Sequence, residues 1–307
     1  MNARARLEGL GETVAFAGEG LEAFLADKDA VFVRLAYRID DDFLKSAPKL
    51  RVVCSPTTGL THINLESLAR RDVKLLSLRG EAAFLEGIHA TPEHAIGLLL
   101  ALLRRYRTAF LDGSNVHWDR DRCRGEELNG MSVGIIGFGR VGRRLATYLS
   151  AFEASVGWYD PFVREAAAGA IRFHTLDDLI AHSRAIILAA AHENSQPPVM
   201  DGNAVAAMAG KYFVNIARGE LVDEASLLAA IERGAFAGCA IDVIANEHLA
   251  DNRVRWIAAT QASNVIVTPH IAGATFTSMQ KTEEFLVERL IDFLGEGAIK
   301  RSRLSVQ

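Results

Sequence analysis

Cysteine is scarce in this chain, and its pattern excludes the usual uses of grouped cysteines. Cys54, Cys123 and Cys239 are the three cysteines among 307 residues, and no two of them have CxxC spacing. Scattered cysteines in odd number predict neither a disulfide framework nor a zinc site, so we interpret them as buried, inert thiols. The histidines show no HxH or HxxxH spacing, and we therefore expect no bound metal.

Long apolar runs and a large excess of charge of one sign are also absent. The longest apolar run, residues 95–103, is only about half of the roughly 20 residues that a membrane-spanning helix needs. Lys and Arg number 34 against 38 Asp and Glu, a net charge of -4 that disfavours nucleic acid as a partner. The first residues lack the apolar stretch of a secretory signal, so we expect a cytoplasmic protein.

Short apolar segments alternate with helical patterns along the whole chain, which is typical of parallel α/β architecture. Because 307 residues exceed one ordinary hydrophobic core, we expect two doubly wound α/β domains. An apolar helix is predicted over residues 91–106, where Thr91 and Pro92 form a start signal. The strands are expected at 13–16, 30–34, 50–54, 73–78, 131–137, 155–160, 185–190, 212–216, 238–243 and 265–268.

A glycine-rich turn, GFGRVG at residues 137–142, follows one predicted strand and opens a predicted helix. Gly137 would allow the tight turn, Gly139 would let the backbone approach a pyrophosphate, and Gly142 would let the helix pack closely on the strand. The phosphates would lie at the positive end of the helix dipole. Glycine-rich turns without a ligand are common, so this motif needs its context.

Asp160 supplies that context, because it ends the next predicted strand 18 residues after Gly142. An acid at about this distance binds the ribose diol of a dinucleotide. Its charge repels a 2′-phosphate and no arginine follows directly, so the sequence predicts NAD rather than NADP. The alternative is that Asp160 is only a turn residue before Pro161.

Four polar residues follow later predicted strands, at the carboxyl edge where doubly wound sheets bind ligands. They are Arg218, Asp242, Glu247 and His270. Each has an ordinary alternative explanation, as a surface charge, a loop acid or a histidine with its hydrogen bonds satisfied.

The combination resembles the D-isomer specific 2-hydroxyacid dehydrogenase family over nearly the whole chain. The matching stretches are TPEHAIGLLLALLRR, GIIGFGRVGRRLA, VNIARGELVDEASLLAAIERG, GCAIDV and TPHIAG. Arg218 and Glu247 are 29 residues apart, and Glu247 and His270 are 23 apart, intervals that are similar to those of the family's catalytic Arg, Glu and His. The resemblance implies an NAD-dependent oxidoreductase that moves a hydride between nicotinamide and C2 of a small 2-hydroxy or 2-keto acid. It also implies a homodimer formed through the Rossmann domain.

The resemblance assigns roles that chemistry supports. Arg218 would hold the substrate carboxylate and C2 oxygen with a fork that lysine lacks. His270 would exchange the proton with that oxygen, and Glu247 would stabilise the protonated ring. Further implied contacts are Arg140 and Val141 to the pyrophosphate, Ile216, Ala217 and Asp242 to the nicotinamide end, and the backbone N–H groups of Thr58 and Gly59 to the substrate carboxylate.

The family pattern also predicts the domain boundaries. Residues 1–103 with 272–307 would form the flavodoxin-like, substrate-binding domain and residues 104–271 the NAD-binding Rossmann domain, with the active site in the cleft. The family normally begins with a strand before its first helix, whereas this chain begins at the helix. Either the start lies upstream or another segment fills the gap. His248 stands where the family usually has proline, and Thr57 and Asn64 also depart from its pattern.

Two other functions fit parts of this sequence. A catalytically silent NAD-binding regulatory protein would share the fold, but the presence of Arg218, Glu247 and His270 argues against it. Formate dehydrogenases resemble the family but pair their histidine with glutamine, so Glu247 disfavours that alternative.

Overall fold

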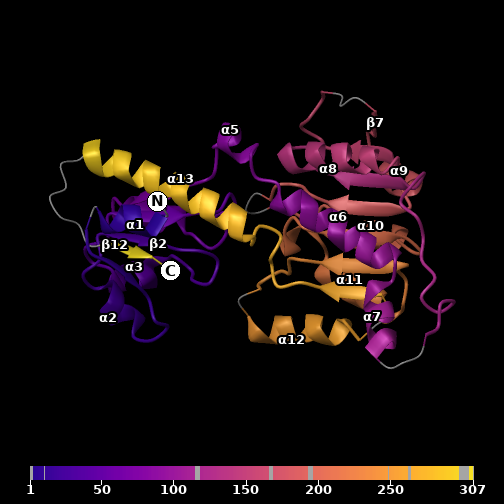
Figure 1. Ribbon diagram of the computed structural model, residues 1–307, viewed down its shortest axis with the longest axis horizontal. Coiled ribbons are helices and arrows are strands. Elements are labelled where there is room, and N and C mark those ends of the chain that lie inside the picture. Colours follow the sequence, from indigo (N-terminus) through magenta and orange to yellow (C-terminus); the bar gives the residue numbers. More distant parts are fainter. Residues whose placement is uncertain are drawn as a thin grey trace. The chain divides into compact units, whose positions relative to one another are not determined.

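The structure is a computed structural model that describes residues 3–9, 11–114, 118–165, 169–192, 196–247, 249–261, 264–296 and 304–306. The chain divides into two compact units, which Figure 1 shows. Unit 1 is Met1–Ile88 with Thr275–Gln307, and unit 2 is His89–Ala274. His248 lies outside the described residues, so its departure from the family pattern has no structural account. None of the helices described is both long and apolar enough to span a membrane.

Unit 1 contains a parallel sheet of five strands in the order β1-β12-β2-β3-β4. The strands are β1 (Thr13–Ala15), β2 (Ala30–Phe32), β3 (Val52–Ser55), β4 (Lys74–Ser77) and β12 (Leu304–Val306). The helices are α1 (Ala3–Glu8), α2 (Leu21–Leu25), α3 (Asp41–Ser46), α4 (Leu65–Arg70), α5 (Ala82–Leu85) and α13 (Phe276–Glu296). Although α1 and α13 lie at opposite ends of the sequence, they pack side by side in this unit (Figure 1).

The last strand, β12, lies inside this sheet. Leu304 pairs with Thr13 of β1 on one side and with Ala30 of β2 on the other. With β12 in the first position, the order is the flavodoxin-like 2-1-3-4-5. The sequence left open what fills the place of the family's first strand, and in this structure β12 does.

Unit 2 contains a parallel sheet of seven strands in the order β11-β10-β9-β8-β5-β6-β7. The order is that of a Rossmann sheet with one further strand at the edge, so the predicted fold class is confirmed. The strands are β5 (Ser132–Ile136), β6 (Ser155–Tyr159), β7 (Ala170–Arg172), β8 (Ala185–Leu188), β9 (Tyr212–Asn215), β10 (Gly238–Ile241) and β11 (Val265–Val267). The helices are α6 (Ala90–Leu103), α7 (Tyr106–Ser114), α8 (Arg140–Ala151), α9 (Leu176–His182), α10 (Gly202–Ala207), α11 (Glu224–Glu232) and α12 (Ala250–Ala259), with a 3₁₀ turn at Gly219–Leu221.

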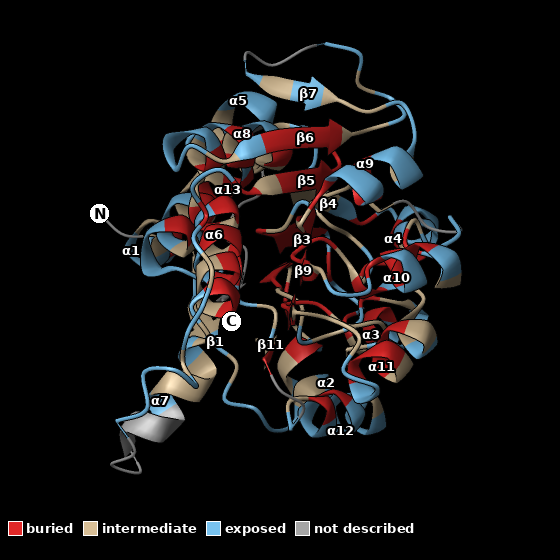
Figure 2. Cartoon of the chain, turned by 90° about the vertical axis from the view of Figure 1, so that its right-hand side faces the viewer, coloured by how far each residue is buried: buried red, intermediate tan, exposed pale blue. Residues whose placement is uncertain are grey.

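Helix α6 belongs to unit 2, whereas the family pattern assigned residues up to 103 to the other domain. Leu99 and Leu102 are fully buried, in one core with Val133 and Ile135 of β5. Figure 2 shows the buried residues of α6 and of the strands in red. The domain division from the sequence stays a prediction, but the packing of this helix is with the Rossmann sheet.

The prediction of one apolar helix over residues 91–106 was wrong at the carboxyl end of the helix. Helix α6 stops at Leu103, and α7 begins at Tyr106. Arg105 has φ of 51°, a left-handed conformation that interrupts an α-helix. The carbonyl of Leu103 instead accepts a hydrogen bond from Glu126 N (2.9 Å), which satisfies one helix-end acceptor.

Two of the three cysteines are fully buried. Cys54 lies in β3 and Cys239 in β10, and burial raises the pKa of both thiols. A thiol that stays protonated is a poor nucleophile, so both fit the inert role that we inferred. Cys123 is only partly buried.

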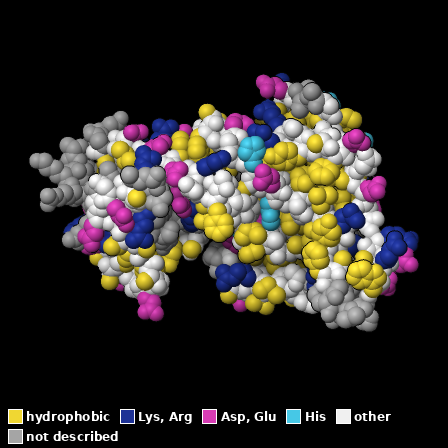
Figure 3. All heavy atoms as spheres, in the orientation of Figure 1, with side chains coloured by type: hydrophobic (Ala, Val, Ile, Leu, Met, Phe, Trp, Pro, Cys, Tyr) yellow, Lys and Arg dark blue, Asp and Glu magenta, His cyan; other side chains and the backbone are white. Residues whose placement is uncertain are grey.

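Charged side chains of both signs are interspersed over the face in Figure 3. Ion pairs occur within each unit, as between Arg70 and Asp41 (2.8 Å) in unit 1 and between Arg184 and Glu126 in unit 2. Exposed pairs of this kind contribute at most about 1 kcal/mol each.

The position of β12 leads to a prediction about unit 1. Replacing Ser305 by Pro removes a backbone N–H from an internal strand, so we expect a loss of about 1–3 kcal/mol in the stability of unit 1. Hydrogen exchange should become faster in β1 and β2, while β5 in unit 2 keeps its protection. Ser305→Thr is the control. If exchange in β1 does not change in the proline variant, β12 does not hold β1 in the sheet.

Candidate active site

The glycine turn after β5 requires two of its glycines for steric reasons. Gly137 has φ of +91°, and a Cβ there would lie 2.4 Å from the Cα of Ala190. A Cβ on Gly142 would lie 2.2 Å from the carbonyl oxygen of Gly137. No other residue fits either position, so β5 and α8 are joined as closely as a dinucleotide-binding turn demands.

Gly139 has a different role, because a Cβ there would meet nothing within 4 Å. It is the N-cap of α8, and Arg140 and Val141 form the first turn of that helix. The backbone N–H groups of a first turn have no partner within the helix, and the dipole makes this end positive. Open space at Gly139 therefore fits a pyrophosphate.

Asp160 follows β6 and joins the glycine turn through its carboxylate. Oδ2 accepts a hydrogen bond from Phe138 N (2.8 Å), and Oδ1 accepts from Phe162 N (2.8 Å) and Val163 N (3.1 Å). A carboxylate offers roughly four acceptor positions, so about one remains on Oδ2 for a ribose hydroxyl. Asp160 thus orders its own turn and still fits the ribose role, and the two explanations that the sequence left open are compatible.

Asn215, the buried last residue of β9, shapes the turn that carries Arg218. Its Oδ1 accepts a hydrogen bond from Ala217 N (3.0 Å), and its Nδ2 donates to the carbonyl of Arg218 (3.1 Å). The turn also contains Ile216, and both Ile216 and Ala217 are 6% exposed. Their predicted contact with nicotinamide stays a prediction.

Arg218 is a largely buried cation whose guanidinium has N–H donors available for an anion. Burial lowers the pKa of its guanidinium, while the carboxylates of Glu247 and Glu220 act in the opposite direction. Nη1 donates to the carbonyl of Ala217 (2.6 Å). A guanidinium has five N–H donors, so several remain for a ligand, and a second negative charge here would offset the cost of its burial.

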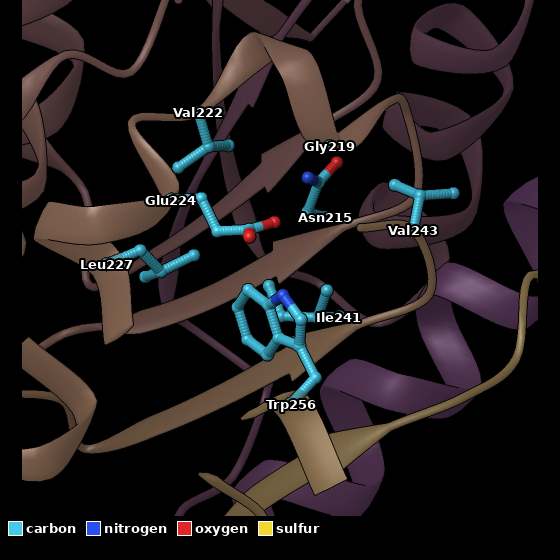
Figure 4. A pocket seen from close by; sticks show the side chains of 8 residues that line it. All are labelled: Asn215, Gly219, Val222, Glu224, Leu227, Ile241, Val243 and Trp256. Carbon is cyan, nitrogen blue, oxygen red and sulfur yellow. The ribbon is translucent and has the colours of Figure 1, made fainter. Parts of the chain in front are cut away.

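The turn of Arg218 lies against the loop that carries Glu247. A Cβ on Gly219 would lie 2.0 Å from Ala245 N and from the carbonyl carbon of Ile244, so only glycine allows this approach. In the same loop, Ala245 N also donates a hydrogen bond to the carboxylate of Glu224 (3.0 Å). Figure 4 shows Glu224 with Asn215 and Val243 among the residues that line a small pocket. The position of Glu247 relative to Arg218 is therefore set by backbone contact.

Glu247 and His270 form the pair that the sequence suggested. Nδ1 of His270 lies 2.9 Å from each carboxylate oxygen of Glu247. Because a carboxylate can only accept, Nδ1 is the donor. Nε2 makes no hydrogen bond to the described residues and is left for proton exchange with a ligand.

His270 has φ of +54°, in the left-handed region that a residue with a side chain occupies at a cost. Asp242, directly after β10, holds this turn. Its Oδ1 accepts from Thr268 Oγ1 (2.6 Å) and Ile271 N (2.9 Å), and its Oδ2 accepts from Ala272 N (3.0 Å). The carbonyl of Asp242 accepts from His270 N (2.8 Å).

The carboxylate of Asp242 is ionised although it is buried. Burial raises its pKa, but hydrogen bonds from His94, Thr268 and the turn outweigh that effect, so the pKa lies below its ordinary value. Both carboxylate oxygens accept hydrogen bonds from residues of this chain. The predicted contact of Asp242 with nicotinamide therefore stays a prediction.

The structure brings Arg218, Asp242, Glu247 and His270 together at the carboxyl edge of the unit 2 sheet. Thr58 and Gly59 lie in unit 1 after β3, where Thr57 Oγ1 donates to the carbonyl of Gly59 (2.9 Å). Their predicted contact with substrate stays a prediction.

Sequence reasoning missed three residues that position this site: Asn215, Gly219 and Thr268. All three stand in stretches that we quoted for the resemblance, and each is within three residues of a predicted catalytic residue. Their positions were therefore visible, but their roles depend on side-chain hydrogen bonds, and for Gly219 on a backbone approach, that no spacing reveals.

Residues 96–272 match a family described as "D-isomer specific 2-hydroxyacid dehydrogenase, NAD binding domain". The predicted cofactor, NAD, agrees with this description, and the glycine turn, α8 and Asp160 are the residues that fit it.

Curated relatives and a solved structure extend the similarity beyond this domain. D-3-phosphoglycerate dehydrogenase of Mycobacterium tuberculosis is 34% identical over 258 residues, 83% of this chain and 47% of the relative. The chain thus spans about half of the length of such relatives. Glyoxylate reductase of Thermofilum pendens is 30% identical over 88% of this chain and 79% of its own. D-Lactate dehydrogenase from Aquifex aeolicus, solved with NAD and lactic acid, shares the fold with a TM-score of 0.81 at 24% identity, covering 96% of this chain and 92% of that one.

The geometry of Asp160 leads to a prediction about cofactor choice. Asp160→Ser should weaken NADH binding by about tenfold or more and narrow the preference for NADH over NADPH, since a diol acceptor and a repelling charge both disappear. Dissociation constants for both cofactors measure the effect. Asp201→Ser is the matched control, because Asp201 also caps a backbone N–H (Ala204 N, 2.9 Å) but follows a different segment. An unchanged NADH to NADPH ratio in Asp160→Ser would contradict the ribose assignment.

Proposed function

Because this chain belongs to the D-isomer specific 2-hydroxyacid dehydrogenase family, we propose that it interconverts a small D-2-hydroxy acid and its 2-keto acid with NAD. The observation that carries the proposal is the pairing of His270 Nδ1 with both oxygens of Glu247, in a site that also contains the partly buried Arg218. These groups provide a proton donor and an anion site, which are what the reaction requires of the protein.

The protein's part in the reaction follows from these positions. When bound, the nicotinamide supplies the hydride to C2 during reduction and accepts it during oxidation. His270 gives the proton on Nε2 to the C2 oxygen, and its ring becomes neutral. One keto acid, one NADH and one proton thus yield one hydroxy acid and one NAD⁺. Glu247 accepts the hydrogen bond of Nδ1 and holds the ring in place, and after the transfer His270 takes a new proton from solvent.

Arg218 provides substrate binding and polarisation. A planar guanidinium can bind a carboxylate through two N–H donors, and a further donor can stabilise negative charge that develops on the C2 oxygen. Because Arg218 is largely buried, these interactions are weakly screened by solvent. This arrangement favours acids over simple ketones, which lack the carboxylate.

The test is consumption of NADH with a panel of 2-keto acids of increasing size, followed by the configuration of the product. Glyoxylate, pyruvate and hydroxypyruvate suit the panel, and acetone is the control without a carboxylate. We expect NADH oxidation with the acids alone and a D-configured product where C2 is chiral. A protein that binds NADH but reduces none of the acids would be the silent regulatory alternative, which no feature of the described site favours.

Other predictions from the sequence belong to this proposal. The homodimer, the cytoplasmic location, the active site in the cleft and the substrate contacts of Thr58 and Gly59 stay predictions. None of them is needed for the roles of Arg218, Glu247 and His270.

Arg218→Lys should behave as a severe change although the charge is kept. An ammonium cannot bind two oxygens in parallel, so kcat/KM for the keto acid should fall by about 10- to 100-fold. NADH binding should stay the same. Arg233→Lys, on an exposed residue at the end of α11, is the control. If NADH binding collapses instead, Arg218 supports the fold and is not an anion site.

Glu247→Gln should separate the charge of Glu247 from its shape. The amide can still accept a hydrogen bond from Nδ1 of His270 but carries no charge, so kcat/KM should fall by about tenfold in both directions, because a hydrogen bond to a charged group is stronger than one to a neutral group. His270→Ala should remove most turnover in both directions and leave NADH binding largely intact. An unchanged kcat/KM in Glu247→Gln would disprove the acid–base pair.

A further inference from the structure

A histidine outside the proposed catalytic set contacts the residues that hold His270. His94 lies in the second turn of α6, and its side chain is 20% exposed. Its Nε2 lies 3.3 Å from Oδ1 of Asp242 and 3.2 Å from Oγ1 of Thr268. The helix thereby reaches the carboxyl ends of β10 and β11 with a polar group.

The hydrogen-bond pattern defines which nitrogen of His94 carries a proton. The hydroxyl of Thr268 donates its one hydrogen to Asp242 Oδ1 (2.6 Å), and a carboxylate has none to give. Both neighbours of Nε2 therefore need a donor. The protonated atom is Nε2, which shares its hydrogen between Asp242 and Thr268.

With His94 included, the carboxylate of Asp242 receives four donors: His94, Thr268, Ile271 N and Ala272 N. That number matches the roughly four acceptor positions of a carboxylate. Two of these donors belong to the turn that carries His270 in its left-handed conformation. A turn in a strained conformation persists only where the surrounding structure holds it in place. The donor from His94 adds such a contact from a different element, α6.

We propose that His94 is a positioning residue: through Asp242 and Thr268 it holds the turn that presents His270 to Glu247. The inference rests on the proposed function for its kinetic consequence but not for its structural one. Without the donor on His94, Oδ1 loses one partner, and its bond to Ile271 N becomes free to rearrange. The ring of His270 then spends less time in the position from which proton transfer is possible.

Two variants of similar size separate this role from simple packing. Gln can place an amide N–H where Nε2 lies, whereas Met fills the same space without a donor. We expect His94→Met to lower kcat by about 10- to 100-fold, because small misplacement of a proton donor has effects of this order. KM for NADH should change less than about twofold, and His94→Gln should keep most of kcat. Equal losses in Gln and Met would show a packing role and overturn the proposal.

Hydrogen exchange gives a reading that does not depend on activity. In His94→Met the amides of Ile271 and Ala272 should exchange faster, because they donate to Asp242. Amides in β5 should keep their protection, and His94→Gln should resemble the unchanged protein at all these positions. If the amides of Ile271 and Ala272 exchange as slowly in His94→Met as in the unchanged protein, the proposal is overturned even if activity falls.

A double-mutant cycle tests whether His94 acts through Asp242. In an Asp242→Asn background, His94→Met should add less than about a twofold further increase in exchange at residues 271 and 272. Fully additive effects would show that His94 acts elsewhere. If the unchanged protein reduces no 2-keto acid, the proposed function fails, yet the exchange measurements still decide whether His94 holds the turn.

Discussion

All strands of the unit 2 sheet run in one direction, and this constraint brings the candidate site together. Parallel strands place their carboxyl ends at one edge, so residues from distant parts of the sequence meet there. The glycine turn follows β5, Asp160 follows β6, Arg218 follows β9, and Asp242 and His270 follow β10 and β11. Because β5 is the strand where the order reverses, the turn with the phosphate-binding features lies where such sheets bind ligands.

Within that edge, the fine positions are set by backbone approaches that only glycine allows. Gly137 lies against Ala190 and Gly219 lies against Ala245, each too close for a Cβ. Such contacts are rigid, because backbone cannot move aside as the end of a long side chain can. The distance between the Arg218 turn and the Glu247 loop is therefore less adjustable than a contact between two side chains would be, which suits a site whose chemistry depends on geometry.

The alternation of strands and helices and the glycine spacing predicted a Rossmann domain and its nucleotide turn, whereas the Glu247–His270 pair was implied by the resemblance to the family. The sequence did not predict β7, which has three residues and an edge position, or β12, whose place in the sheet depends on chain topology. It also extended α6 past Arg105, since a left-handed residue leaves no mark in apolar periodicity. The roles of Asn215, Gly219 and His94 depend on contacts across the fold, which residue spacing does not encode.

The network around Asp242 shows why a buried charge can belong to such a site. An unpartnered carboxylate in this position would be costly, and it would bind a proton instead. Its donors come from α6, from Thr268 and from the His270 turn, and their hydrogen bonds together outweigh the effect of burial on the pKa of Asp242. Hydrophobic packing could join the same segments without the desolvation cost of a buried charge, but it would not specify the direction of a turn. The negative charge is what orients two successive backbone N–H groups, and this orientation leaves His270 facing Glu247 with Nε2 free.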